Sequence, residues 1–294
     1  MNRRMILLAV TAIALATLAC SININLPNQD IKTGPTQIEN IAVPLLSDQQ
    51  TVADVTLNYG AGTFTLQPGA TTDLISGTVK YNVADFKPVI TINGSDISVE
   101  QGNLKFTGIP TINSNIVNDW NLSLASVPMN LTIKAGAYQG KYELGGLSLQ
   151  SLNVTDGAAK VDLSFSKLNL VKMSSLEYTT GASEVTLTGL SNTNTSDLTF
   201  RSGAGNYTLD FSGDLRSNMT VNIQSGVSQV TVVVPVGMNA QVITQTGLMA
   251  VSASGGWVQN GNTYTLSGSG NTITINVEMG AGNLRLQTNN AARP

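Results

Sequence analysis

The stretch Leu198-Thr199-Phe200-Arg201-Ser202-Gly203-Ala204-Gly205-Asn206-Tyr207-Thr208-Leu209 decides the fold of this chain. On both sides of Gly203, apolar side chains alternate with polar ones; the apolar ones are Leu198, Phe200, Tyr207 and Leu209. Alternation with a period of two residues is typical of a β-strand that buries one face. The stretch therefore predicts two short strand segments that meet at a glycine.

The same pattern recurs along the chain. All four apolar positions are filled around Gly60, Gly157, Gly181, Gly226 and Gly280, and three of the four around Gly136 and Gly247. From Gly136 to Gly247 the successive glycines are 21, 24, 22, 23 and 21 residues apart. A steady period of this length indicates a solenoid, in which each turn buries its apolar face against neighbouring turns.

The spacing around each glycine predicts a bend. The last apolar residue before it and the first after it, such as Phe200 and Tyr207, are an odd number of positions apart, so in a straight strand they would face opposite sides. Both face one core only if the chain turns between them. Glycine suits this corner because it tolerates either a positive φ or the close approach of another backbone. Five corners continue with alanine, at Ala137, Ala158, Ala182, Ala204 and Ala281.

The composition favours an extended, all-β protein. Of the 294 residues, 41% are hydrophobic, whereas only 5% are aromatic and 11% are charged. Many β-branched residues and few charges are typical of strands. The formal net charge is −3, and no basic cluster lies beyond the amino terminus, so we expect no nucleic-acid partner.

Residues 1–19 are typical of a secretory signal peptide, with Arg3 and Arg4 before an apolar core that is too short for a confident membrane span. The only cysteine, Cys20, follows at once, and Ala16-Thr17-Leu18-Ala19-Cys20 resembles a bacterial lipobox, although the commonest form has leucine in place of Thr17. Cys20 is therefore the candidate lipidation site, with several acyl chains anchoring the protein stably. The alternative is an ordinary signal peptide followed by a chance cysteine.

The chain after the signal peptide divides into four parts. Residues 20–50, which contain three prolines and many Asn, Gln and Asp, predict a flexible, disordered tether. Residues 51–125 predict a smaller amino-terminal β domain, with one copy of the pattern at Gly60 and a hairpin at Asn93-Gly94. A single-stranded β-solenoid then spans 126–288, including an inserted hairpin between Trp257 and Tyr264. Residues 289–294 form a polar tail.

No catalytic motif is found. The chain has no histidine, which excludes a histidine-dependent triad and removes the commonest metal ligand. Asp156 and Asp162 are the only clustered acidic pair within one turn, with Lys160 between them, and a solvated outer face explains them more simply than a two-carboxylate site. Neither a phosphate-binding glycine loop nor a calcium-binding repeat is present, so we expect no metal, no cofactor and no enzyme activity.

Three aromatic residues are candidates for a carbohydrate site. Trp120, Trp257 and Tyr264 lie near hairpins or near the boundary between the two β parts. Aromatic rings stack on sugars, but at such places they more often pack against the protein itself. Packing is the favoured interpretation.

Several segments resemble bacterial toast-rack proteins. They are Trp120-Asn121-Leu122-Ser123-Leu124, Leu131-Thr132-Ile133-Lys134-Ala135-Gly136-Ala137, Leu144-Gly145-Gly146-Leu147, the recurring Gly-Ala corners and Val230-Thr231-Val232-Val233-Val234-Pro235. The resemblance covers about residues 50–288. It implies a β-solenoid of a kind that also occurs in adhesin-like proteins and in regulators of the cell-envelope stress response, and it implies no catalytic residue.

These observations predict a lipid-anchored lipoprotein on the extracytoplasmic face of a bacterial membrane, acting as a non-catalytic binding, adhesion or scaffolding module of the cell envelope. Its regular Thr, Ser and Asn faces suit an envelope polymer or a protein partner, and its ends suit end-to-end self-association. One alternative is a regulatory subunit of an envelope-stress sensor, which rests on the resemblance alone. Another is a polysaccharide-active β-helix enzyme.

Overall fold

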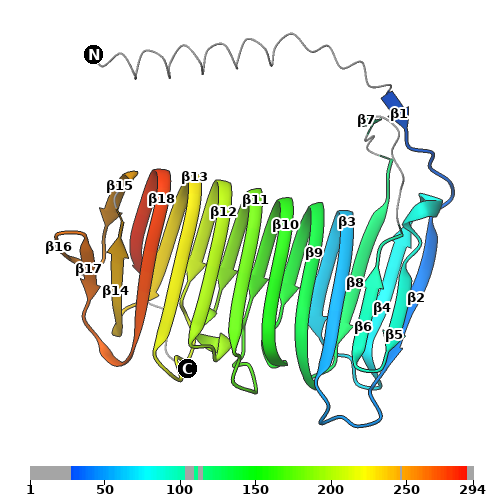
Figure 1. The fold of residues 1–294 in the computed structure, drawn as a ribbon, viewed down its shortest axis with the longest axis horizontal. Helices are drawn as coiled ribbons and strands as arrows, with labels where there is room; N and C mark the ends of the chain where they lie inside the picture. Colours follow the sequence, from blue (N-terminus) through cyan, green and yellow to red (C-terminus); the bar gives the residue numbers. More distant parts are fainter. Residues whose placement is uncertain (1–27, 103–108, 112–114, 246, 290–294) are drawn as a thin grey trace, which may run out of the picture. The chain divides into compact units, whose positions relative to one another are not determined.

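The computed structural model describes residues 28–102, 109–111, 115–245 and 247–289. These fall into two compact units, of which the smaller contains a parallel pair of short strands, β1 (Asn28–Asp30) and β7 (Ile109–Thr111). The larger unit is a 16-stranded sheet (Figure 1). The predicted signal peptide, Cys20, the first residues of the predicted tether and most of the predicted polar tail lie outside the described residues.

Seven long strands form the regular part of the sheet. In spatial order they are β3 (Ala53–Pro68), β9 (Pro128–Glu143), β10 (Ser148–Ser164), β11 (Ser175–Thr188), β12 (Asp197–Asp210), β13 (Met219–Pro235) and β18 (Ser269–Asn289). Each is parallel to the next (Figure 1). The all-β, single-stranded solenoid is confirmed.

Every long strand bends at its template glycine, as the spacing predicts. On β12 the rings of Phe200 and Tyr207, which flank Gly203, have centroids only 5.3 Å apart. Leu198 and Leu209 are fully buried on the same side. We call the part of each strand before the glycine its first arm and the part after it its second arm. The two arms form two walls, and the apolar core lies between them.

The template glycines are required by close stacking of the corners. Gly203 does not have a positive φ, which occurs instead two residues later, at Gly205. A Cβ on Gly203 would lie 2.7 Å from the carbonyl oxygen of Gly181, and one on Gly181 would lie 2.4 Å from the carbonyl oxygen of Gly157. Of the two reasons considered for a glycine at this position, the close backbone approach is therefore the one that applies.

At the amino-terminal end, shorter strands extend both walls beyond β3. The first-arm wall continues with the hairpin β6 (Asp96–Glu100) and β5 (Val89–Asn93), and the second-arm wall with β8 (Asn118–Leu124), β4 (Asp73–Tyr81) and β2 (Gln37–Pro44). A short 3-10 helix, η1 (Ala84–Phe86), buries Phe86. The hairpin predicted at Asn93-Gly94 is confirmed, with Asn93 paired to Asp96.

Strand β2 differs from the prediction of a flexible tether over residues 20–50. Ile41 and Val43 alternate with exposed residues and are buried, because β2 pairs with β4 in antiparallel register. The prolines on either side of this segment masked its short alternation. The domain boundary predicted at residue 125 stays a prediction, although the sheet crosses it without interruption, since β3 pairs directly with β9.

At the carboxyl-terminal end, the stacking order departs from the chain order. β14 (Met238–Thr244) and β15 (Leu248–Ala253) together replace one bent strand, yet both lie beyond β18, which comes later in the chain. The predicted hairpin is confirmed as β16 (Val258–Asn260) and β17 (Thr263–Leu266), and it extends the first-arm wall from β14. The last long strand thus fills a slot between β13 and the pair β14 and β15.

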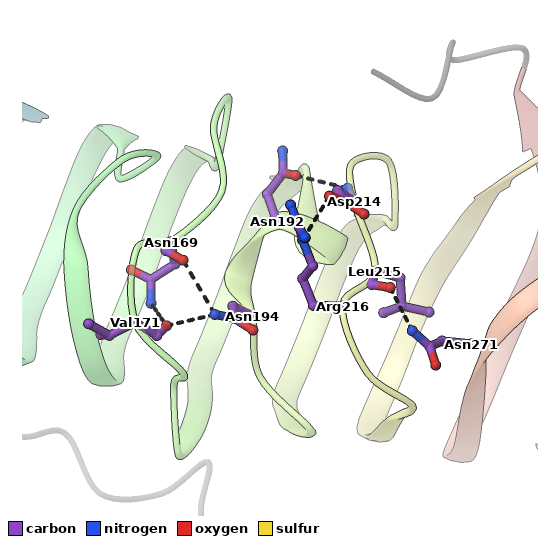
Figure 2. A network of polar contacts seen from close by, with 8 residues as sticks. All are labelled: Asn169, Val171, Asn192, Asn194, Asp214, Leu215, Arg216 and Asn271. Atoms are coloured by element: carbon purple, nitrogen blue, oxygen red, sulfur yellow. Dashed lines mark hydrogen bonds and ion pairs between the residues drawn. The ribbon is translucent and has the colours of Figure 1, made fainter.

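Asparagine side chains join the loops between successive turns (Figure 2). Asn169 is fully buried, and its side chain exchanges hydrogen bonds with the backbone of Leu149, at 2.9 and 2.8 Å. In the next loop, which includes the 3-10 helix η2 (Leu190–Thr193), Asn194 donates to the carbonyl oxygen of Val171 at 3.0 Å. Asn192 accepts from the backbone N–H of Asp214 at 2.9 Å. These bonds pair backbone N–H and C=O groups of the loops that have no partner in a neighbouring strand.

Candidate binding face

The outward side chains of the first arms form straight columns, because each strand is in register with the next. The middle column lies four residues before each template glycine. Its members are Thr56, Thr132, Asn153, Glu177, Thr199, Asn222 and Asn276. Adjacent strands are about 4.8 Å apart, so the column presents short polar side chains at that interval along the wall.

Hydrogen bonds between neighbouring turns hold these polar side chains in place. Asn276 donates to the side-chain oxygen of Asn222 at 3.0 Å. In the column nearer the strand starts, Asn130 donates to the carboxylate of Asp54 at 2.8 Å, and Ser151 donates to the side-chain oxygen of Asn130 at 2.8 Å. Side chains that are already ordered lose less conformational entropy when a ligand binds.

A groove of about 500 Å³ lies where this wall meets the corners of the last turns. The side chains of Arg201, Gln224 and Glu278 line it from the first arms, and Ser202 and Ser225 lie beside them. The two serine hydroxyls are 2.7 Å apart. The groove therefore presents a cation, an anion, an amide and hydroxyl groups within a short distance. We call the middle column together with this groove the first-arm face.

Asp156 is buried, which corrects the interpretation of a solvated acidic pair. It is only 6% exposed and accepts hydrogen bonds from the hydroxyls of Tyr178, at 2.6 Å, and of Thr180. Burial raises the pKa of the Asp156 carboxyl, and these hydrogen bonds oppose that rise. Asp162 lies on the outer side of the same strand, so the two carboxylates are not brought together.

The position of Asp156 could have been found in the sequence. It lies one residue before Gly157, in the same phase as the buried Leu152 and Val154, whereas Asp162 is out of phase with the buried Val161 and Leu163. In the two neighbouring turns the equivalent position is occupied by Ala135 and Thr180. The alternation of inward and outward positions along the strand was therefore the signal that identifies Asp156 as buried and Asp162 as exposed.

The three aromatic candidates do not form a stacking platform. Trp120 is 1% exposed, packs edge-on against Tyr59 and Phe64, and donates its indole N–H to Asn118. Tyr264 is buried on β17. These two residues pack in the core, which was the favoured interpretation. Trp257 is partly exposed, but its indole nitrogen is buried and has no hydrogen-bond partner among the described residues.

The described part of the chain contains no cluster of three or more Cys, Asp or Glu residues that could hold a metal ion. It also contains no helix of the length and apolarity needed to cross a bilayer.

A bent parallel strand in every turn, corners stacked glycine on glycine and regular polar columns define a β-solenoid with a display surface. Residues 32–171 and 167–233 match the family model described as "N-terminal domain of toast_rack, DUF2154". The chain therefore belongs to the toast-rack family. No curated protein matches it significantly.

Comparison with solved structures finds bacterial proteins. The structure of a "putative cell adhesion protein" from Clostridium sporogenes ATCC 15579 is 23% identical in sequence, covers 86% of this chain and 100% of its own, and has a TM-score of 0.50. That of a "putative adhesin" from Bacteroides fragilis NCTC 9343 is 8% identical, covers 88% and 99%, and has a TM-score of 0.37. At 23% identity, the first similarity concerns the fold alone.

Proposed function

We propose that this protein is a non-catalytic binding module of the bacterial cell envelope, and that the first-arm face binds an extended polymer rich in hydroxyl or amide groups. The observation that carries this proposal is the middle column, in which six of seven turns present Thr or Asn. The corresponding column of the second arms is interrupted by Lys141, Asp162 and Arg285. A repeating wall suits a repeating ligand.

The chemistry of the first-arm face supports this class of ligand. Asn and Thr both donate and accept hydrogen bonds, so they match the hydroxyl and acetamido groups of envelope glycans. Each single contact contributes little, but many in-line contacts add up along one chain. The buried Asp156 and the outward Asp162 supply no pair of carboxylates for hydrolysis. The name of the Clostridium sporogenes structure, a "putative cell adhesion protein", agrees with binding as the role.

We further propose that Cys20 carries the lipid anchor, which would hold the described sheet on the extracytoplasmic side of the membrane. The unique cysteine directly after a signal-peptide-like segment supports this. Replacing Cys20 by Ser should move the protein from the membrane fraction to the soluble fraction, with an unchanged melting temperature. Retention of the Cys20→Ser protein in the membrane fraction would contradict the proposal.

The binding proposal is tested with two substitutions on one strand. Thr199→Arg places a long side chain on the first-arm face, and Thr208→Arg places the same side chain on the outer side of the second arm of β12. Binding to a glycan array and to isolated cell-wall material should fall at least tenfold for Thr199→Arg and stay unchanged for Thr208→Arg.

Two other results would exclude the first-arm face as the binding site. Equal losses for both variants would point to a general effect of the added charge. If an envelope pull-down recovered a sensor kinase and no polymer, with Thr199→Arg and Thr208→Arg behaving alike, the regulatory alternative would replace polymer binding.

A further inference from the structure

The carboxyl-terminal end of the solenoid carries no charge over an unusually long stretch. From Ser217 to Val277 there is no Asp, Glu, Lys, Arg or His, although the whole chain has 15 Lys and Arg and 18 Asp and Glu. This stretch contains β13, β14, β15, β16, β17 and the first arm of β18 as far as Val277, just before Glu278. One end of the sheet is therefore built almost wholly from uncharged residues.

The edge strands at this end are not protected. β15 has the sequence Leu-Met-Ala-Val-Ser-Ala, pairs with β18 on one side, and has no partner on the other among the described strands. Leu248 is 84% exposed and Val258 on β16 is 63% exposed. Edge strands usually avoid pairing with other chains by means of charges or proline. At the amino-terminal end β2 has both, in Glu39 and Pro44, whereas β15 and β16 have neither, like the short strand β5 at the other end.

The two walls end in a step. Beyond β18 the first-arm wall continues with three strands, β14, β17 and β16, whereas the second-arm wall continues with β15 alone. Consider a two-fold axis parallel to the strands and midway between the walls. It superposes the long wall of one copy on the short wall of the other. In each joined wall, β15 of one copy and β16, β17 and β14 of the other copy then lie between the two β18 strands. The short wall of each copy is thus completed by the long wall of the other.

The strand directions also fit this arrangement. β14 is parallel to β18, β17 is antiparallel to β14, and β16 is antiparallel to β17, so β16 runs toward the corner. β15 is parallel to the second arm of β18 and runs away from the corner. An axis along the strands preserves these directions. The edge of β16 would thus meet β15 of the second copy as an antiparallel pair, twice in each dimer.

We propose that the occupant of this end is a second copy of the chain, joined by antiparallel pairing of β15 with β16 in a two-fold dimer. The charge pattern favours a copy over an unlike partner. Two uncharged ends meet without like-charge repulsion or burial of an unpaired charge, and a charged partner would find no opposite charge there. The dimer would place two first-arm faces on one particle, independently of what those faces bind.

The test is the oligomeric state of the purified full-length chain, measured by sedimentation velocity over a range of concentrations. The unmodified chain should form a reversible dimer. Ser252→Lys on β15 and Asn260→Glu on β16, which lie at the same level along the strands, should each raise the dimer dissociation constant at least tenfold, because each places an unpaired charge in both joints. Both residues are exposed, so circular dichroism should confirm an unchanged fold. Ile92→Lys on the exposed edge strand β5, at the other end, is the matched control and should leave the dimer intact.

Mixing the two variants identifies the strand pairing. In a dimer of Ser252→Lys with Asn260→Glu, one joint carries both opposite charges and the other is unmodified, so dimer formation should return. A strictly monomeric unmodified chain would overturn the proposal. So would dissociation by Ile92→Lys alone, or failure of the mixture to associate, since a β15-to-β15 contact would not be repaired by a charge on β16.

Discussion

At the scale of single residues, replacing Gly181 should destabilise the fold more than replacing Gly157, because the corners stack more closely at Gly181. A Cβ on Gly181 would lie 2.4 Å from a neighbouring carbonyl oxygen, whereas one on Gly157 would lie 3.2 Å from the equivalent atom. Gly181→Ala should therefore lower the free energy of unfolding by about 1 to 3 kcal/mol, as overpacking does. Gly157→Ala should cost less than about 1 kcal/mol. Denaturant titrations compare the two directly, and equal losses would mean that the corners relax freely.

Asp156 makes stability depend on pH. Because burial raises the pKa of this carboxyl in the folded state, its contribution is fully present below the ordinary pKa and is lost as the pH rises through the raised value. Asp156→Asn removes this loss. The stability of Asp156→Asn relative to the unmodified chain should thus increase between about pH 4 and pH 7. Asp162→Asn controls for the loss of one negative charge, and a parallel trend in that variant would contradict the assignment.

At the scale of elements, the bent strands were predictable because each turn carries its own alternation and glycine. Two features were not. Ile41 and Val43 form too short an alternation to identify β2, whose burial depends on pairing with a distant segment, β4. The stacking order was hidden because β18 has the same local pattern as the other turns, and only tertiary packing places it beside β13. The polar columns of the first-arm face follow from the same alternation, whereas the groove depends on that stacking order.

The inserted position of β18 predicts that this strand stays bound after the chain is cut. Ile273, Ile275, Val277, Leu284 and Leu286 are fully buried, and each contributes on the order of 1.5 to 3 kcal/mol. A protease site introduced at Ser267-Gly268 should give two fragments that still migrate together on size exclusion. With Ile275→Asp, which buries a charge, the cut fragments should separate. Separation without that substitution would mean that β18 is only loosely held.

At the scale of the whole molecule, local unfolding should spread between strands that are adjacent in the sheet, and not between strands that are merely adjacent in the sequence. Each turn is stabilised chiefly by the turns on either side, so local unfolding spreads to immediate neighbours first. Gly203→Val introduces a branched side chain where a single Cβ would already lie 2.7 Å from the carbonyl oxygen of Gly181. Hydrogen exchange should therefore rise most in β11, β12 and β13 and least in β3, which lies four turns from β12 in the sheet.

At the carboxyl-terminal end, the order of β14 and β18 in the sheet differs from their order in the chain, so the two routes of unfolding can be distinguished there. β14 follows β13 directly in the chain, but β18 lies between them in the sheet. In Gly203→Val, amides of the first arm of β18 should lose more protection than those of β14, even though β14 is about thirty residues nearer to the substitution along the chain. Exchange measured by mass spectrometry on peptides from 238–244 and 273–277 distinguishes the two orders. Greater loss in β14 would show that damage follows the chain, and uniform loss throughout would indicate one cooperative core in place of stacked turns.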